Sequence, residues 1–169
     1  MVSPLNQYRP QSRVLARSVL DRLLDASPDI KQDPPISLLD QLREMREAIR
    51  RDLEALLNTR RCPITPPSEL TELKNALACY GVDGIVSVNL VTDEAKLVLA
   101  RALERTITRF ETRLSDVRVT ILRNGAGSRR TLRIRIEAMF RPHDGMPPIS
   151  FETMIDPSTQ HFLVEAPRG

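Results

Sequence analysis

The fold is decided by residues 109–122, whose sequence is RFETRLSDVRVTIL. Before this stretch, apolar residues recur every three or four positions, as they do on one face of a helix. From Leu114 the period falls to two, with β-branched residues at Val117, Val119 and Ile121. We therefore expect a helix to end and a strand to begin inside this stretch.

Downstream, the two-residue period returns and is interrupted by residues that favour turns. Strands are predicted at residues 117–122, 132–138, 149–155 and 161–165, with a hairpin turn at 124–127 and another turn at 156–159. Successive strands joined by such short turns pair in antiparallel fashion, so these residues are expected to form one antiparallel sheet.

Upstream, the strongest helical pattern covers residues 37–58. Ser37 and Asp40 form a start that resembles a capping box. One apolar stripe then follows at Leu38, Leu42, Met45, Ile49, Leu53 and Leu56. The prolines of residues 62–67 cannot continue a helix, so this one is expected to end near Asn58.

Shorter helices are predicted at residues 17–25 and 68–77, and Thr92 is expected to cap another long one. A brief strand is expected at 86–88. The fold class is therefore α+β, with N-terminal helices packed on a C-terminal antiparallel β-sheet. We expect residues 36–169 to form a single domain, preceded by an N-terminal extension, residues 1–35, that carries a short amphipathic docking helix.

The composition favours protein binding over nucleic-acid binding. The chain has 169 residues and a formal charge of +3, and its 25 basic residues include only three lysines: Lys31, Lys74 and Lys96. Arginine suits bidentate pairing with carboxylates at interfaces, although GC-rich codon usage explains the same bias. Because the arginines are interleaved with acids and aromatic residues are scarce, a nucleic-acid surface is disfavoured.

The expected compartment is the cytoplasm. No apolar run approaches the ~20 residues that cross a bilayer, and Met1 to Pro10 lacks the pattern of a secretory signal. Cys62 and Cys79 are expected to stay reduced there. With His143 and His161 they make no zinc spacing, so no metal or cofactor is predicted.

Two arginine-bearing segments, residues 50–61 and 109–114, lie where one element gives way to another. In an extended segment, residues i and i+2 point to the same side, so Glu111 and Arg113 are predicted to face one partner together. The alternative is an intrachain salt bridge that braces the junction, for example to Arg60 or the arginine that follows it.

In their order along the chain, these segments resemble the gp25-like family, the baseplate wedge proteins of contractile phage tails and type VI secretion systems. The resemblance covers about residues 18–160 and is closer to the type VI branch, the TssE proteins. It rests on SVLDRL at 18–23, RDLEALLNTR at 51–60, YG at 80–81, RFETRL at 109–114 and RIRIEA at 133–138. The family's Glu-Pro-Arg signature falls on Glu111, Thr112 and Arg113, and losing the proline frees this turn slightly.

The resemblance implies a structural role without catalysis, in an assembly docked at the inner membrane. Family members contact larger wedge proteins (TssF and TssG) and provide the platform on which the sheath subunits (TssB and TssC) assemble. An edge strand at residues 161–165, with unpaired backbone groups, is expected to accept a sheath segment as a further strand. The residues expected to contact partners are Leu20, Asp21, Arg22, Leu23, Asn58, Thr59, Arg60, Phe110, Glu111, Arg113, Phe162 and Val164.

Two other functions are weighed against this one. The family has been labelled lysozyme-like, but glycoside hydrolysis needs two carboxylates about 5 to 9.5 Å apart across a sugar-binding cleft. Most of the 22 acidic residues flank arginines, no pair is marked out, and tryptophan is absent. A cytoplasmic adaptor unrelated to secretion is the stronger alternative, and co-purification with large baseplate subunits distinguishes it from a wedge protein.

Overall fold

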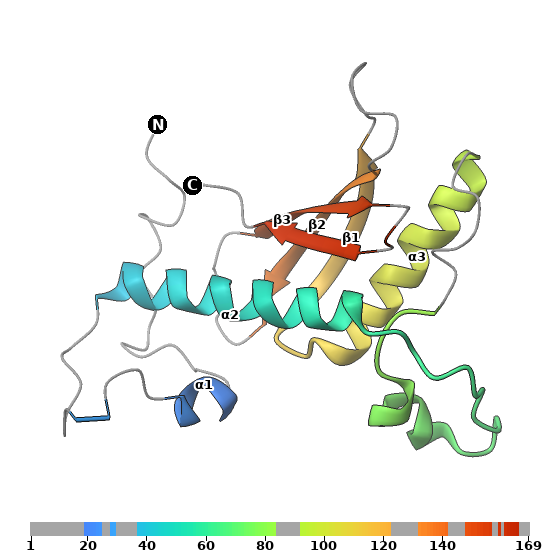
Figure 1. Cartoon of the computed structure of the whole chain (residues 1–169), viewed down its shortest axis with the longest axis horizontal. Helices are drawn as coiled ribbons and strands as arrows, with labels where there is room; N and C mark the ends of the chain where they lie inside the picture. The colour runs from blue at the N-terminus through green and yellow to red at the C-terminus, as the bar shows by residue number, and fades with distance from the viewer. Residues whose placement is uncertain are drawn as a thin grey trace.

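Figure 1 shows a computed structural model of the chain, with two long helices in front of and beside a small sheet. The structure describes residues 19–24, 28–29, 37–83, 92–122, 132–141, 148–156, 159 and 161–165. The predicted brief strand at 86–88 and hairpin turn at 124–127 lie outside these residues.

The sheet is a four-stranded antiparallel meander with the order β1-β2-β3-β4. Its strands are β1 (Leu114–Leu122), β2 (Leu132–Phe140), β3 (Ile149–Asp156) and β4 (His161–Glu165). Side chains alternate between buried and exposed along β2 and β4, so one face of the sheet lies on the core and the other faces solvent. The predicted α+β fold class and all four predicted strands are confirmed.

A β-bulge near the start of β1 makes this strand longer than its two-residue period predicts. The register against β2 shifts between Ser115 and Arg118. Asp116, inside the bulge, has φ 51, a left-handed conformation that aspartate adopts more readily than most residues. The extra residue lets Leu114 as well as Val119 point into the core, although their spacing does not fit a regular strand.

The long helices are α2 (Leu38–Asn58) and α3 (Asp93–Phe110), and both pack on the inner face of the sheet. The predicted caps are confirmed: the Ser37 and Thr92 side chains accept backbone N–H groups, each at 3.2 Å. The apolar stripe of α2 joins buried residues of α3 and of all four strands in one core. Helix α2 runs along β4 and α3 runs along β1, so each helix lies beside one edge of the sheet.

The predicted helix at 68–77 is wrong in its form. The chain makes two short 3-10 helices, η2 (Thr71–Asn75) and η3 (Leu77–Cys79), separated at Ala76. Its leucines are largely exposed and do not form a buried stripe, so packing does not extend these turns into an α-helix. The N-terminal helix, α1 (Val19–Leu23), lies within its predicted range and sits close to α2 in Figure 1.

Candidate functional site

The turn between α3 and β1 holds an ion pair between the charged residues that the sequence singled out. Glu111 ends α3, and only 7% of its surface is exposed. The Arg113 guanidinium donates through Nε to Glu111 Oε1 at 2.7 Å and through Nη2 to Oε2 at 2.5 Å, a bidentate arrangement. The backbone N–H of Arg113 also donates to Oε1, at 3.2 Å. These bonds hold the turn around Thr112, the position at which the Glu-Pro-Arg signature has its proline.

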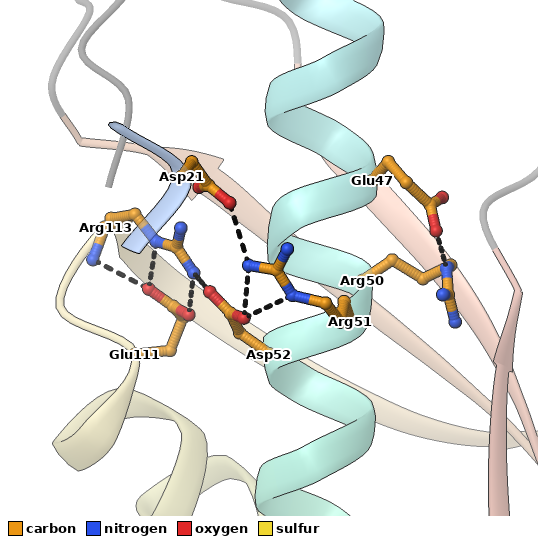
Figure 2. A network of polar contacts seen from close by, with 7 residues as sticks. All are labelled: Asp21, Glu47, Arg50, Arg51, Asp52, Glu111 and Arg113. Carbon is orange, nitrogen blue, oxygen red and sulfur yellow. Dashed lines mark hydrogen bonds and ion pairs between the residues drawn. The ribbon is translucent and has the colours of Figure 1, made fainter. Parts of the chain in front are cut away.

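Further polar contacts connect this ion pair to α2 and α1, as Figure 2 shows. Arg113 Nη2 also donates to Asp52 Oδ2 at 2.7 Å, and the other oxygen of Asp52 accepts from Arg51 at 3.0 and 3.1 Å. Arg51 then reaches Asp21 of α1 at 2.9 Å. We call Asp21, Arg51, Asp52, Glu111 and Arg113 the corner network. It ties α1, α2 and the α3–β1 turn together through alternating charges.

Each charged side chain of the corner network is paired with one of opposite charge. Hydrogen bonds from Arg113 to Glu111 raise the pKa of Arg113 above its usual value, and those from Arg51 to Asp21 and Asp52 do the same for the pKa of Arg51. Burial, assisted by the carboxylates of Asp52 and Glu111, raises the pKa of the nearby Tyr80 hydroxyl. A guanidinium held in this way keeps its proton at any physiological pH, so it suits bracing rather than proton transfer.

The alternative interpretation, an intrachain salt bridge that braces the junction, is the one that the structure shows, but its further partner is Asp52 and not Arg60 or Arg61. Glu111 and Arg113 pair with each other and with Asp52, whereas Arg61 pairs with Asp83 at 3.2 Å. The physical reason is geometric, because Asp52 lies on the side of α2 that faces the turn (Figure 2), whereas Arg60 and Arg61 follow the end of the helix.

Asn58 is one of the predicted site residues, and it holds the outer edge of β4. Its side-chain amide Nδ2 donates to the carbonyl of Phe162, and its Oδ1 accepts the N–H of the same residue, both at 2.9 Å. This amide therefore bonds to β4 as the backbone of a neighbouring strand would. The side chain of Phe162 is buried in the core.

Two further α2 side chains continue this pairing along β4. The N–H of Val164 donates to Glu54 at 3.3 Å, and its carbonyl accepts from Arg50 at 3.1 Å. Arg50 and Glu54 also pair with each other at 2.6 Å. The expectation that the outer groups of this edge strand are unpaired is therefore wrong at Phe162 and Val164, because polar residues of α2 cover them.

The opposite edge of the sheet is covered in a similar way. Glu104 of α3 accepts the N–H of Val119 in β1 at 2.8 Å. Both edges thus have backbone groups bonded to side chains of the adjacent helix. This arrangement protects a small sheet from uncontrolled pairing with other strands.

The loop after α2 is closed where the predicted residues Thr59 and Arg60 leave the helix. Thr59 and Arg61 exchange backbone hydrogen bonds with Val82 at 2.8 and 3.0 Å. Gly81 has φ 104, and a Cβ there would lie 2.3 Å from the Thr59 carbonyl oxygen, so only glycine fits. The Arg60 side chain remains exposed at this point.

Phe110 is another predicted contact residue, and it is half-buried against Tyr80. Their rings meet edge to face, with centroids 5.3 Å apart. This contact fastens the end of the loop to the end of α3, next to the corner network. Phe110 therefore makes an intrachain contact next to the corner network.

The residues of α1 that were predicted to contact partners point in two directions. Asp21 points toward Arg51, whereas Leu20 and Leu23 are 54% and 76% exposed. Leu24, just after the helix, is exposed as well. The side chain of Arg22 lies outside the part of the chain that the structure describes. An anchored helix with exposed leucines is the form expected of a docking element.

Comparison with known proteins identifies the family. A family model described as baseplate wedge protein gp25 matches residues 43–144, more than half of the chain. The chain belongs to the gp25 baseplate wedge family. A structural role in a baseplate, in contact with other baseplate components, follows from this membership. No curated protein matches the chain.

The part that matches the gp25 family runs from α2 to just beyond β2. It includes Arg51, Asp52, Glu111 and Arg113, and it excludes α1 and β4. Four of the five residues of the corner network therefore lie in the part that matches the gp25 family, and Asp21 lies outside it. The exposed leucines of α1 and the covered edge of β4 are features of this chain outside the matched residues.

Sequence reasoning missed the residues that connect these elements. Asp52, Glu54 and Arg50 were not predicted as site residues, although all lie in or beside the first arginine-bearing segment. Asp52 and Arg113 are 61 positions apart, and Glu54 and Val164 are 110 apart, so no local spacing reveals either contact. The available signal was the row of charged residues that borders the apolar stripe of α2.

Within the described ranges, no three or more His, Cys, Asp or Glu side chains are grouped so that they could hold a metal ion. Among the helices of the described residues, none has the length and apolar character needed to span a membrane.

Proposed function

We propose that this gp25-family chain is a structural component of a type VI secretion baseplate, of the TssE kind. In this proposal it joins the larger wedge proteins TssF and TssG to the sheath subunits TssB and TssC and helps to start sheath assembly. It acts by binding alone, in the cytoplasm, in an assembly docked at the inner membrane. The observation that carries the proposal is the anchored helix α1, whose leucines face outward beside the corner network.

The wedge-facing surface is assigned to α1 and the exposed residues around the corner. Asp21 and Arg51 fix the orientation of α1, so Leu20 and Leu23 are offered to a partner on a helix that is already positioned. Pre-positioning reduces the entropy lost on binding. Glu111 and Arg113 support this surface from behind, and the exposed side chain of Arg60 lies at the start of the neighbouring loop.

The sheath-facing surface is assigned to β4. A sheath segment that adds to this strand must take over the backbone groups of Phe162 and Val164 from Asn58, Glu54 and Arg50. Strand addition would then be an exchange of hydrogen bonds, and the side chains of α2 would prevent premature pairing. Weakening this cover by Asn58→Ala is expected to start sheaths earlier in a purified assembly; later or unchanged initiation would remove β4 from the proposal.

The wedge assignment is tested by co-purification of the full chain with TssF and TssG. Leu20→Asp/Leu23→Asp is expected to reduce recovery of both partners at least tenfold, because two charges would enter an apolar contact. Ile64→Asp/Leu77→Asp is the matched control, since both residues are also exposed but lie after α2, in the loop and in η3. Equal recovery from the first variant and from wild type would contradict the assignment. Failure of the wild-type chain to recover either partner would favour an independent adaptor.

A further inference from the structure

The outer face of α3 carries three arginines that have no acidic partner among the residues that the structure describes. Arg101, Arg105 and Arg109 are exposed, and within the described part of the chain no carboxylate pairs with them. Arg105 Nε donates to the carbonyl of Arg101 at 3.2 Å. Several other guanidinium groups of the described residues, those of Arg51 and Arg113 for example, are paired with acids.

These arginines form one stripe that continues into exposed apolar residues. Leu97, Arg101, Arg105 and Arg109 recur every four positions, so each lies about 6 Å further along the helix axis than the last. Leu97 and its neighbour Val98 are 51% and 53% exposed at the upstream end. The opposite side of the helix is buried in the core. We call these five residues the α3 stripe.

Within the described residues, none of the three acids of α3 forms an ion pair with the α3 stripe, and the exposed Glu94 lies in the first turn, before Leu97. Glu104 is committed to the backbone of Val119 at 2.8 Å. Asp93, in the first turn, bonds to Lys96 at 2.9 Å. From Leu97 to Arg109 the exposed face is therefore positive, with an apolar end.

We propose that the α3 stripe is the docking surface for an acidic helical segment of another protein subunit. A helix packed along α3 with Asp or Glu at every fourth position would place its carboxylates at the same spacing of about 6 Å as the arginines. An apolar side chain at its end would cover Leu97 and Val98. The proposed function determines only which assembly the other subunit belongs to. The acidic, helical character of the docking segment is inferred from the α3 stripe itself.

A protein segment fits this surface better than a nucleic acid does. The stripe has three positive charges on a single helix and includes no aromatic side chain on which a base could stack. Its exposed leucine and valine suit an apolar contact rather than phosphate groups. The surface is also separate from α1 and from the β4 edge, because α3 lies beside β1 at the other side of the sheet.

Site-specific photo-cross-linking of the full chain tests the inference. A benzophenone amino acid replaces Val98 in cells that make the complete apparatus, and mass spectrometry identifies the cross-linked peptide. The expected product is a segment of another subunit with at least three carboxylates at helical spacing. Charge reversal in Arg101→Glu/Arg105→Glu/Arg109→Glu is expected to lower the cross-linked fraction at least about tenfold, because three attractions become repulsions.

A matched control separates this surface from a general effect of charge. Arg43→Glu/Lys74→Glu/Arg118→Glu changes the net charge equally at exposed residues of other elements, and less than twofold loss is expected. Cross-links to nucleic acid or to a neutral or basic segment, an undiminished yield after reversal, or no cross-link at all would overturn the inference. Recovery of TssF and TssG by the same cells reports separately on the proposed function, so the two failures are distinguishable.

Discussion

Replacing Arg113 with methionine removes the cation that neutralises Glu111 and keeps much of the side-chain volume. The side chain of Glu111 is only 8% exposed, and both of its oxygens face Arg113. Breaking a buried ion pair at one partner typically costs 3–5 kcal/mol, because the other charge stays without compensation. Asp52, the second carboxylate on Arg113, is partly solvated. We therefore expect a loss near the lower limit, about 3 kcal/mol, in the free energy of unfolding.

Urea denaturation followed by circular dichroism measures this loss. With a slope of about 2 kcal/mol/M, a change of about 3 kcal/mol moves the midpoint by about 1.5 M. Glu111→Gln/Arg113→Met is expected to recover part of the loss, since a neutral amide is less costly to bury than a carboxylate. Arg43→Met is the control, because Arg43 is 76% exposed and its pairing with Asp40 lies in solvent, so little change in stability is expected. A loss below about 1 kcal/mol in Arg113→Met, or no recovery in the double variant, would refute the reasoning.

Three other substitutions test separate parts of the structure. Asn58→Ala leaves the N–H and carbonyl of Phe162 unpaired, so a loss of about 1–3 kcal/mol is expected, with faster hydrogen exchange at the Phe162 amide; unchanged exchange would contradict the edge cover. Gly81→Ala forces a side chain against the Thr59 carbonyl oxygen at positive φ, and thermal unfolding should show a clear fall in Tm, whereas an unchanged Tm would contradict the close approach. Hydrogen bonds from two arginines lower the pKa of Glu152, so its contribution to stability is present above about pH 4.5 and is lost as the pH falls. Glu152→Gln should accordingly show a flatter fall in stability between about pH 6 and pH 3, and an identical profile would exclude this contribution.

Local patterns in the sequence predict most of the fold. The change of period at Leu114, the caps at Ser37 and Thr92 and the apolar stripe of α2 all depend on neighbours within a few residues, and the structure contains them. The segment at 68–77 shows the limit of this reasoning. Its leucines have helical spacing, but without a surface to bury them only short 3-10 turns form.

The site is predicted less completely because its contacts are distant along the chain. Glu111 and Arg113 were identified from local spacing, yet their second partner, Asp52, is set by how α2 crosses the turn. The cover over β4 depends on three α2 side chains meeting a strand more than a hundred residues later. Hydrophobic periodicity determines which faces pack, but it does not determine which polar residues meet at the border of the core.

The central claim is that the corner network positions α1 for partner binding. The most direct test is the affinity of the purified chain for the TssF–TssG wedge proteins after Arg51→Met, which breaks the contacts to Asp21 and Asp52. Arg51 is partly exposed, so the free energy of unfolding should change by less than about 1 kcal/mol. We predict an affinity at least about tenfold weaker, because α1 must then be ordered on binding. An affinity equal to that of wild type, in a variant that is equally stable, would contradict the account.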